Sequence, residues 1–478
     1  VGIRNGRFAR IGVVHGQGRT EIDATGRYVS PGWIDMMDQS GGVLPRNPLA
    51  ENKLMMGVTT AIGGEGGTPV PASEIPAYFR RLETQGISIN FGSYFSETQT
   101  RVPVLGRSAR APTADELGRM RAIMDTAMRN GAMGMTTALI YPPSSYATTD
   151  ELAALASEAG RLGGFYHSHV RYTLGDRFLD PFREAIEIGR RADAPSHITH
   201  FYHRATFPGT PDQMLALVDD ARSEGLDVTF DAYPSEWAST RLLITVPLWV
   251  QEGGPGPTKE RLADPAVRER IRVELQERGV LYAGPRGLAA IRLGAFRSPR
   301  NVRWEGYPLG EVAAVTGRDP VDALCDLLLE EDLRLNQVTP GPHIDGIRRF
   351  YQHPVSMVGT DSTFVGAKPS PRTYGSYPRI LGQFVRDEAI LTLEAAVAKM
   401  TSLPADRLGL RDRGRLADGL VADVVVFNPA TVRSTATYHE PRQFPKGIEH
   451  VIVNGRHVVE YGAPTGALPG RSLRRGRA

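Results

Sequence analysis

Residues 30–40 read Ser-Pro-Gly-Trp-Ile-Asp-Met-Met-Asp-Gln-Ser, and the rest of the chain is arranged around this stretch. Pro31 and Gly32 form a turn signal. The apolar pair Trp33–Ile34 that follows is typical of a short buried strand, and the strand gives way at once to polar residues. This pattern indicates a strand that ends at the mouth of a functional site.

From about residue 31 to residue 400, short apolar runs alternate with amphipathic stretches. The repetition of strand and helix predicts a parallel α/β fold, and the number of repeats favours a TIM-like (β/α)8 barrel over an open sheet. Barrel enzymes carry their chemistry on the loops after the strands, so the last residue of each apolar run is of interest. The expected strands lie in 61–62, 87–92, 133–141, 164–169, 195–200, 228–233 and 356–361, and the expected helices include 113–130, 149–162, 180–191, 211–224 and 393–400.

Both ends of the chain have a β pattern. Residues 1–30 alternate apolar and polar positions between turn signals, and residues 423–429 and 448–456 resemble strands. We therefore expect one small β-sandwich built from both termini. The expected division is 1–30 for the first part of the sandwich, 31–405 for the barrel and 406–478 for the rest of the sandwich and a tail. Within the barrel, residues 253–257 are expected to open an insertion-like loop.

Size and charge exclude several classes of protein. A length of 478 residues suits a barrel of roughly 250 residues or more with an accessory domain. The net charge is only +3, from 56 basic and 53 acidic residues that are interspersed, so neither nucleic acid nor a membrane surface is an expected partner. No apolar run reaches the roughly 18 residues needed to span a bilayer. The basic run 471–477 is expected to be a solvated tail.

The termini and the cysteine content set further limits. Cys325 is the only cysteine, which excludes an intramolecular disulfide and a cysteine-based zinc cluster, and its apolar surroundings predict a buried structural thiol. The chain begins at Val1 without methionine, which suggests a trimmed N-terminus, so a signal peptide is neither visible nor excluded. A cytoplasmic or a periplasmic location and a homo-oligomeric state are left open.

Histidines and an acid end three of the expected strands. In 166–171 His167 and His169 share one side of a strand, whereas only one of His197 and His200 can share the final layer. Asp361 ends another apolar run, where a buried charge needs a partner. Such a set suits a zinc site that polarises a carbonyl and lowers the pKa of bound water towards roughly 7. The alternative is that these histidines are ordinary structural residues of the core.

Glu65 lies in the run Gly63-Gly-Glu-Gly-Gly, which directly follows the expected strand at 61–62. The flanking glycines let the backbone approach a ligand closely. On its own this signal is weak, because a glycine-rich turn with one acid is common. It is not a phosphate loop, because neither the GxGxxG spacing nor a following Lys-Ser/Thr is present.

Several longer motifs, in the right order along essentially the whole chain, resemble the N-acyl-D-amino-acid deacylase (D-aminoacylase) family of the amidohydrolase superfamily. The resemblance implies a TIM-like barrel with a small β-sandwich, and zinc-dependent hydrolysis of the amide bond of N-acylated D-amino acids. The motifs are residues 57–60, 139–142, 370–379, 399–405, 413–423 and 453–456.

The resemblance assigns roles position by position. His169 and His200 match the two histidines that hold the tightly bound zinc, and Asp361 matches the catalytic aspartate. Arg372 would clamp the free carboxylate of the substrate through bidentate hydrogen bonds. The further positions that match substrate contacts are Tyr141, Tyr233 and Ser239.

The chain also departs from the family pattern. The His-x-His pair of the first strand is replaced by Met37 and Gln39, which should remove the second, weak metal position and leave both side chains to line the substrate pocket. The bridging cysteine of the family falls at Gly66, beside Glu65. Because a catalytic zinc normally has three protein ligands, Glu65 is the expected replacement. The alternative is that Glu65 only caps a turn and that the site is metal-poor or inactive.

Two further family positions differ. The lysine two residues after the second zinc histidine is Tyr202, and the histidine before Pro371 is Ser370.

The sequence thus predicts a single-zinc amidohydrolase that acts on N-acyl amino acids, with the D configuration left open, or on related peptide-like small molecules. Glu65, His169 and His200 would hold the zinc, Asp361 would act as general base and acid, and Tyr141 or Tyr233 would assist at the carbonyl. Two alternatives stay open. One is an amide-forming or acyl-transfer enzyme that uses the same site, and the other is a non-catalytic, metal-free binding protein on the same fold.

Overall fold

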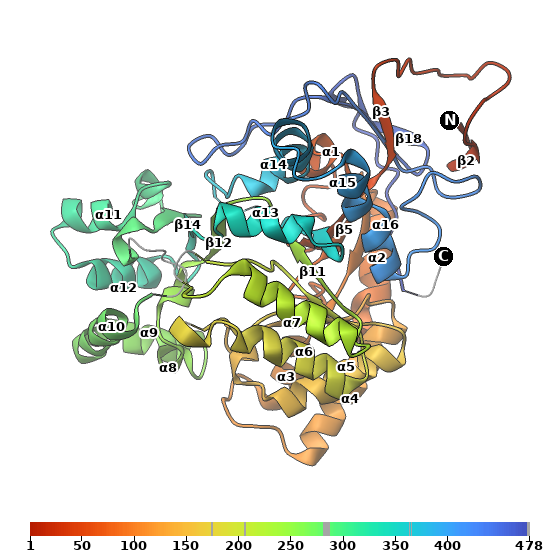
Figure 1. The fold of residues 1–478 in the computed structure, drawn as a ribbon. Coiled ribbons are helices and arrows are strands. Elements are labelled where there is room, and N and C mark those ends of the chain that lie inside the picture. Colours follow the sequence, from red (N-terminus) through yellow and green to blue (C-terminus); the bar gives the residue numbers. More distant parts are fainter. Residues whose placement is uncertain (174, 205–206, 281–286, 363, 365, 476–478) are drawn as a thin grey trace.

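The computed structural model describes residues 1–475 except 174, 205–206, 281–286, 363 and 365. It has a (β/α)8 barrel at its centre, as the sequence predicts (Figure 1). One parallel sheet runs in the order β15-β11-β10-β9-β8-β7 and a second runs in the order β4-β5-β6. The strands are β4 (Trp33–Asp38), β5 (Val58–Gly63), β6 (Asn90–Ser93), β7 (Phe95–Ser96), β8 (Met135–Ala138), β9 (Tyr166–His169), β10 (Ser196–Ile198), β11 (Val228–Ala232) and β15 (Ser356–Val358). Only Tyr94 separates β6 from β7, and the two pair with β5 and β8 as successive parts of one barrel strand.

Helices cover the outside of the barrel, and the predicted ones all form. Thr113 caps its helix through a reciprocal pair of hydrogen bonds with Glu116, because side chains at these two positions satisfy the free N–H groups of a first turn. Thr148 and Thr210 also accept a backbone hydrogen bond at the start of their helices. The covering helices are α1 (Glu51–Met55), α2 (Ile75–Gln85), α3 (Glu97–Leu105), α4 (Ala114–Arg129), α5 (Thr149–Arg161), α6 (Asp180–Ala192), α7 (Pro211–Ser223), α13 (Ile344–Gln352), α14 (Arg372–Arg379), α15 (Leu393–Met400) and α16 (Ser402–Leu408).

A buried ion network closes the barrel between its first and last strands. Asp38 pairs with Ser362 in parallel, beyond the end of β15. Below this pair, the Nζ atom of Lys53 lies 2.6 Å from Oδ2 of Asp35 and 2.7 Å from Oδ1 of Asp38. The three charged side chains are fully buried, and the Nζ atom also donates to Oγ1 of Thr360 at 2.9 Å. Although burial opposes its charge, the two carboxylates raise the pKa of Lys53 and keep it an ammonium.

The two ends of the chain meet in one small antiparallel sheet, in agreement with the predicted sandwich. The strand β3 (Tyr28–Pro31) pairs with β16 (Val424–Phe427), so that Tyr28 lies opposite Phe427. The sheet continues in the order β16-β17-β18-β19, and a separate hairpin of β1 and β2 pairs with the segment before β16, where Arg7 lies opposite Val421. The predicted division at residues 30 and 405 stays a prediction. These strands are β1 (Gly2–Arg4), β2 (Arg7–Arg10), β17 (Ile448–Val453), β18 (Arg456–Glu460) and β19 (Ala463–Pro464).

The insertion predicted to open at 253–257 is present, but the prediction that this segment is a loop was wrong. Proline is favoured in the first turn of a helix, where its missing N–H needs no partner, and Pro255 accordingly begins a helix. The segment is part of an inserted unit with its own apolar core, which lies to one side of the barrel in Figure 1. Its helix α12 buries Cys325, as expected. The unit contains β12 (Trp237–Arg241), β13 (Arg292–Gly294), β14 (Asn336–Pro340), α8 (Leu248–Gln251), α9 (Pro255–Ala263), α10 (Pro265–Arg278), α11 (Leu309–Thr316) and α12 (Pro320–Glu330).

The prediction of a solvated tail at 471–477 was also wrong for residues 471–475, which the structure describes. The backbone N–H of Phe91 donates to the carbonyl of Arg471 at 2.9 Å, and that of Leu473 donates to the carbonyl of Phe91 at 2.7 Å. The tail thus pairs with β6, and Leu473 is buried. Leu473 is surrounded by arginines in the sequence, so the composition of the segment does not indicate that it is buried.

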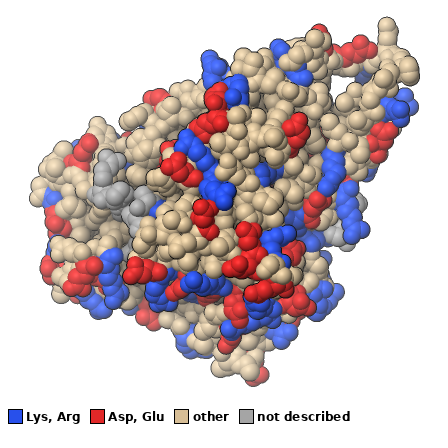
Figure 2. Space-filling model, in the orientation of Figure 1, with Lys and Arg blue, Asp and Glu red and all other residues tan. Residues whose placement is uncertain are grey.

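The surface agrees with the balanced composition. Figure 2 shows blue and red side chains intermixed over the face that it presents. No helix among the described residues is long and apolar enough to cross a membrane.

The closing network leads to a test of stability. We expect Lys53→Met to lower the free energy of unfolding by about 3–5 kcal/mol, because it leaves Asp35 and Asp38 buried without their counter-charge. Such carboxylates have a raised pKa in the folded state, so the variant should regain stability as the pH is lowered below neutral. Denaturant unfolding followed by circular dichroism measures both effects.

Lys399→Met is the matched control. Lys399 is also buried, but its Nζ atom donates to the carbonyl of His353 at 2.6 Å and to Oγ of Ser356 at 2.9 Å, and not to a carboxylate. Its loss should cost less. Equal losses in the two variants would show that the network does not stabilise the closure.

Candidate metal centre and active site

Glu65 is held over the barrel mouth by a tight glycine turn after β5. The N–H of Gly64 donates to the carbonyl of Asp38 at 2.6 Å, and the N–H of Gly67 donates to the carbonyl of Gly64 at 2.8 Å. A Cβ atom at Gly64 would lie 2.8 Å from Sδ of Met37, so the close approach to β4 requires glycine there. The turn directs the Glu65 side chain, which is only 7% exposed, into the mouth.

His169 and His200 come from neighbouring strands and are both buried. His169 is the last residue of β9, and His200 lies two residues beyond the end of β10. The side chain of His200 is also held from behind, where the hydroxyl of Tyr172 lies 3.2 Å from its Nδ1 atom. This contact leaves the Nε2 atom of His200 facing the mouth.

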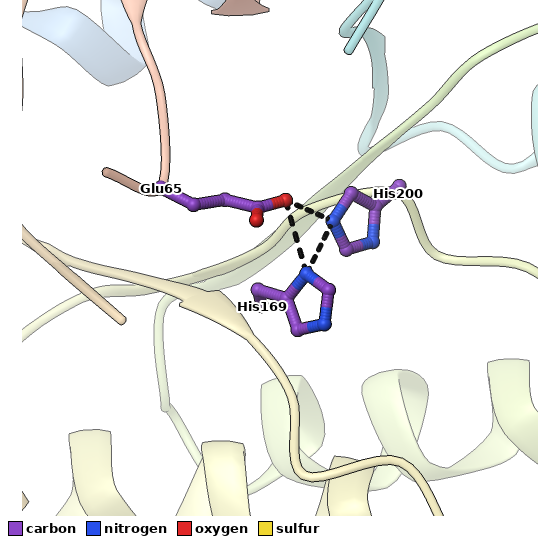
Figure 3. A group of neighbouring side chains, drawn as sticks. All are labelled: Glu65, His169 and His200. Atoms are coloured by element: carbon purple, nitrogen blue, oxygen red, sulfur yellow. Dashed lines mark hydrogen bonds and ion pairs between the residues drawn. The ribbon is translucent and has the colours of Figure 1, made fainter. Parts of the chain in front are cut away.

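Glu65, His169 and His200 converge on one point (Figure 3). The Oε1 atom of Glu65 lies 2.6 Å from Nε2 of His200 and 3.0 Å from Nδ1 of His169, and the two nitrogens are 2.9 Å apart. The prediction that these three residues lie together therefore agrees with the geometry.

The chemistry of this group fits a divalent cation. A single proton on Nε2 of His200 can serve only one of its two neighbours, whereas a cation satisfies all three atoms at once. In a zinc site with bonds of 2.0–2.1 Å, neighbouring ligand atoms are about 3.3 Å apart. The observed separations of 2.6, 2.9 and 3.0 Å are shorter than this value, so the three side chains would have to move apart to hold an ion.

The charges in the group are those of a carboxylate that faces two histidines. Burial opposes a charge on His200, but Glu65 raises its pKa to about 9, so a bound cation would take the place of its proton. Burial by itself would raise the pKa of Glu65, but His169 and His200 reverse this effect and lower it, so Glu65 is an anion. Burial lowers the pKa of His169, which favours the neutral imidazole that a metal requires.

Asp361 lies beside this group, just after β15, and forms a pair with a buried arginine. An oxygen of its carboxylate accepts a hydrogen bond from Nη2 of Arg372, and its backbone carbonyl accepts one from Nε of Arg372 at 2.9 Å. Burial raises the pKa of Asp361 to about 6, although Arg372 opposes this effect. Asp361 is thus poised to exchange a proton close to neutral pH.

Arg372 has capacity for a further ligand. Its guanidinium lies 4.2 Å from the centre of the Tyr233 ring, and Nη2 also donates to the carbonyl of Ser239 at 3.1 Å. Within the described part of the chain, the buried Nη1 atom has no hydrogen-bond partner. Because a buried, unsatisfied guanidinium N–H is costly, this atom is suited to an anionic ligand.

The other predicted contact residues are close to these groups. The ring of Tyr141 lies 5.6 Å from that of His169, and the ring of Tyr233 lies 6.5 Å from that of His200. The hydroxyl of Tyr141 is hydrogen-bonded to Thr240, which follows Ser239 on β12. The inserted unit therefore supplies one wall of the site.

The expectation that Met37 and Gln39 both line the pocket was wrong for Met37 and stays a prediction for Gln39. Met37 is fully buried and packs under Gly64. Gln39 donates from Nε2 to Oδ1 of Asp361 at 3.4 Å. Residues two positions apart in a strand point to the same side, but β4 ends at Asp38, so Gln39 does not have to follow the direction of Met37.

A second group of histidines lies one layer deeper. The Nε2 atom of His197 is 2.9 Å from Oδ2 of Asp231, and that of His167 is 4.0 Å from the same oxygen. The Nδ1 atom of His197 is hydrogen-bonded to Thr229 at 2.7 Å, and the ring of His167 stacks on Tyr94 at 4.2 Å. We interpret these residues as a packed, hydrogen-bonded part of the core.

Sequence reasoning missed Asp231, Asp35 and Lys53. Asp231 interrupts the apolar strand Val228–Ala232, and this was the available signal. The last residue of the expected run 228–233 is Tyr233, so a prediction based on strand ends alone does not reach Asp231.

Comparisons with known proteins agree with the fold and the site. The model of the "Amidohydrolase family" matches residues 289–459. The chain is 33% identical to an N-acyl-D-glutamate deacylase of Alcaligenes xylosoxydans xylosoxydans, over 99% of this chain and 92% of that protein.

Two solved structures are also similar over almost the whole chain. One is an N-acyl-D-glutamate deacylase from Bordetella bronchiseptica, complexed with zinc and a phosphonate inhibitor that mimics the tetrahedral intermediate. It has 30% identity and a TM-score of 0.82 over 99% of this chain and 94% of that chain. The other is a D-aminoacylase with a binuclear metal centre, described as having one-metal activation and second-metal attenuation. It has 28% identity and a TM-score of 0.83 over 99% of this chain and 95% of that chain.

The barrel, the strand-end histidines and the acid beside them define a metal-dependent amidohydrolase, a hydrolase of amide bonds. Within that superfamily, the chain belongs to the D-aminoacylase family. It is thus an enzyme by descent, and the alternative of a metal-free binding protein loses its support.

Proposed function

We propose that this enzyme hydrolyses the amide bond of N-acyl-D-amino acids with a single zinc ion held by Glu65, His169 and His200. The observation that carries the proposal is the buried guanidinium of Arg372 beside Asp361. The Nη1 atom of Arg372 has no hydrogen-bond partner among the described residues. An N-acyl amino acid offers a free carboxylate for this atom and an amide carbonyl for the metal. The D configuration is supported by the deacylase relatives.

One zinc ion accounts for the available donors. Glu65, His169 and His200 give the two nitrogens and one oxygen that are typical of a catalytic zinc with an open fourth position. At the end of the first strand, Met37 and Gln39 offer no imidazole for a second ion. The bound ion would polarise the amide carbonyl and lower the pKa of water towards roughly 7.

The side chains around this ion divide the remaining work. Asp361 accepts the proton of the attacking water and then delivers it to the leaving nitrogen, which is the usual sequence for a general base that becomes a general acid. Gln39 and Arg372 orient its carboxylate through the hydrogen bonds described above. Arg372 binds the carboxylate of the substrate, and Tyr141 and Tyr233 border the carbonyl.

The ligand role of Glu65 is tested by metal content. We expect Glu65→Ala to fall from about one zinc per chain to a small fraction, because two histidines are too few to retain a catalytic zinc. Elemental analysis after dialysis against metal-free buffer gives the stoichiometry.

Glu97→Ala is the control, because Glu97 is an equally buried glutamate whose carboxylate accepts from Oγ of Ser144 at 2.7 Å and lies outside the metal group. It should keep its zinc. If Glu65→Ala also keeps one zinc per chain, Glu65 is not a ligand.

The role of Arg372 is tested with two substrates. We expect Arg372→Met to lower kcat/KM for an N-acyl-D-amino acid by about 10²- to 10³-fold, which corresponds to the loss of a buried, charge-assisted contact. The same substitution should have a much smaller effect on the corresponding N-acyl-D-amino acid amide, which has no free carboxylate.

Arg379→Met in the same helix provides the control, because Arg379 pairs with Glu236 at 2.8 Å away from the site. Its kinetics should match those of the wild type. Equal losses on both substrates in Arg372→Met would mean that Arg372 only orients Asp361.

The proton transfer predicts an acid limb in the pH profile. Asp361 must be ionised to accept a proton, and burial raises its pKa to about 6, so kcat/KM should fall as the pH drops through this value. A bound cation favours the carboxylate, so the limb should lie at about pH 6 or somewhat below. The profile is measured together with zinc content at each pH, and activity that stays flat through this range at full zinc content would exclude Asp361 as the base.

A further inference from the structure

The backbone of His200 is strained. Its φ is +36°, in the left-handed region that residues other than glycine rarely adopt. Such a conformation costs about 1–3 kcal/mol and persists only where the surroundings hold it. Because this turn of the chain aims the imidazole at Glu65 and His169, whatever holds the backbone also sets the metal group.

Asp231 forms three hydrogen bonds with the turn. Its Oδ1 atom accepts from the backbone N–H of His200 at 2.8 Å and from the hydroxyl of Thr199 at 3.1 Å. Its backbone carbonyl accepts from the N–H of Phe201 at 2.7 Å. Three consecutive residues are thus fastened to one residue of the adjacent strand β11.

The carboxylate of Asp231 is itself held from two sides. Its Oδ2 atom lies 2.9 Å from Nε2 of His197, whose other nitrogen is bonded to Thr229. On the other side is Gly359, where a Cβ atom would come within 2.6 Å of Oδ1. Asp231 is fully buried, so its position is determined by packing as well as by hydrogen bonds.

We propose that Asp231 is a positioning residue, which holds the strained backbone of His200 so that its Nε2 atom meets Glu65 and His169. Asp231 touches neither the imidazole of His200 nor the place of the metal, and it acts through the main chain. The inference rests on the proposed role of Glu65, His169 and His200 as zinc ligands.

The test compares zinc affinity in two variants, by competition with a chromophoric chelator. We expect Asp231→Ala to weaken zinc binding by about 10- to 100-fold, the usual effect of losing a group that orients a ligand. Asp231→Asn should restore most of the affinity, since its Oδ1 atom can still accept from His200 while its amide donates to His197. A residue that only stabilised the fold through its charge would not show this rescue.

Asp35→Ala is the matched control. Asp35 is an equally buried carboxylate, and its Oδ1 atom accepts from the backbone N–H of Thr360 at 2.8 Å, at the end of β15 and away from the metal group. Its loss should lower stability and activity while zinc affinity stays near that of the wild type. Gly359→Ala is a second route if Asp231→Ala does not fold, because the added methyl group presses on the carboxylate and should weaken zinc binding.

Four results would overturn the proposal. They are wild-type zinc affinity in Asp231→Ala, wild-type affinity in Gly359→Ala, equal weakening in Asp231→Ala and Asp35→Ala, and no rescue in Asp231→Asn. Failure of the underlying function is distinguishable, because then the wild-type protein itself would bind no zinc, or Glu65→Ala would bind it equally well.

Discussion

The site depends on two buried carboxylates that hold strained backbone at the ends of strands. His200 and Asp361 have φ values of +36° and +43°. Asp231 accepts the N–H of His200, and Asp35 accepts the N–H of Thr360, next to Asp361. Hydrogen bonds to charged groups contribute about 1.5–3 kcal/mol each, which is comparable to the strain of about 1–3 kcal/mol per residue. The hydrogen bonds of Asp231 and Asp35, which lie beneath the barrel mouth, therefore offset the strain energy of the backbone at His200 and Asp361.

The contacts beneath the mouth also show what the residues of β4 do in place of the family's His-x-His pair. Met37 fills the space under the glycine turn that carries Glu65, and Gln39 steadies Asp361 from the side opposite Arg372. Lys53 supplies a buried positive charge between Asp35 and Asp38. The strand has kept its place in the barrel while its terminal residues have taken on packing and orientation.

Much of the fold could be predicted because its signals are local. Thr113 and Thr148 mark helix starts, and apolar runs such as Val228–Ala232 mark strands. The candidate metal and substrate residues could be proposed because they follow the ends of such strands and match family motifs. Asp231 and Lys53 could not, because a buried charge is tolerated only if distant residues pair with it, and nothing in the sequence states which residues those are. The burial of the tail could not be predicted for a similar reason, since Leu473 is held by Phe91 of β6, which is distant in the sequence.

The sequence by itself determined the alternation of strands and helices, the pairing of the two β-rich ends and the family, because these depend on periodicity and on residue types at fixed spacing. Only the tertiary structure decided that Glu65 reaches the two histidines, that His167 and His197 stay a layer below them, and that Asp231 holds the strained turn at His200. The physical reason is that the barrel brings together strand ends that are far apart in the sequence, by 135 residues for Glu65 and His200 and by 324 for Asp38 and Ser362. Distances and hydrogen bonds between such ends are set by closure of the sheet and not by any local pattern.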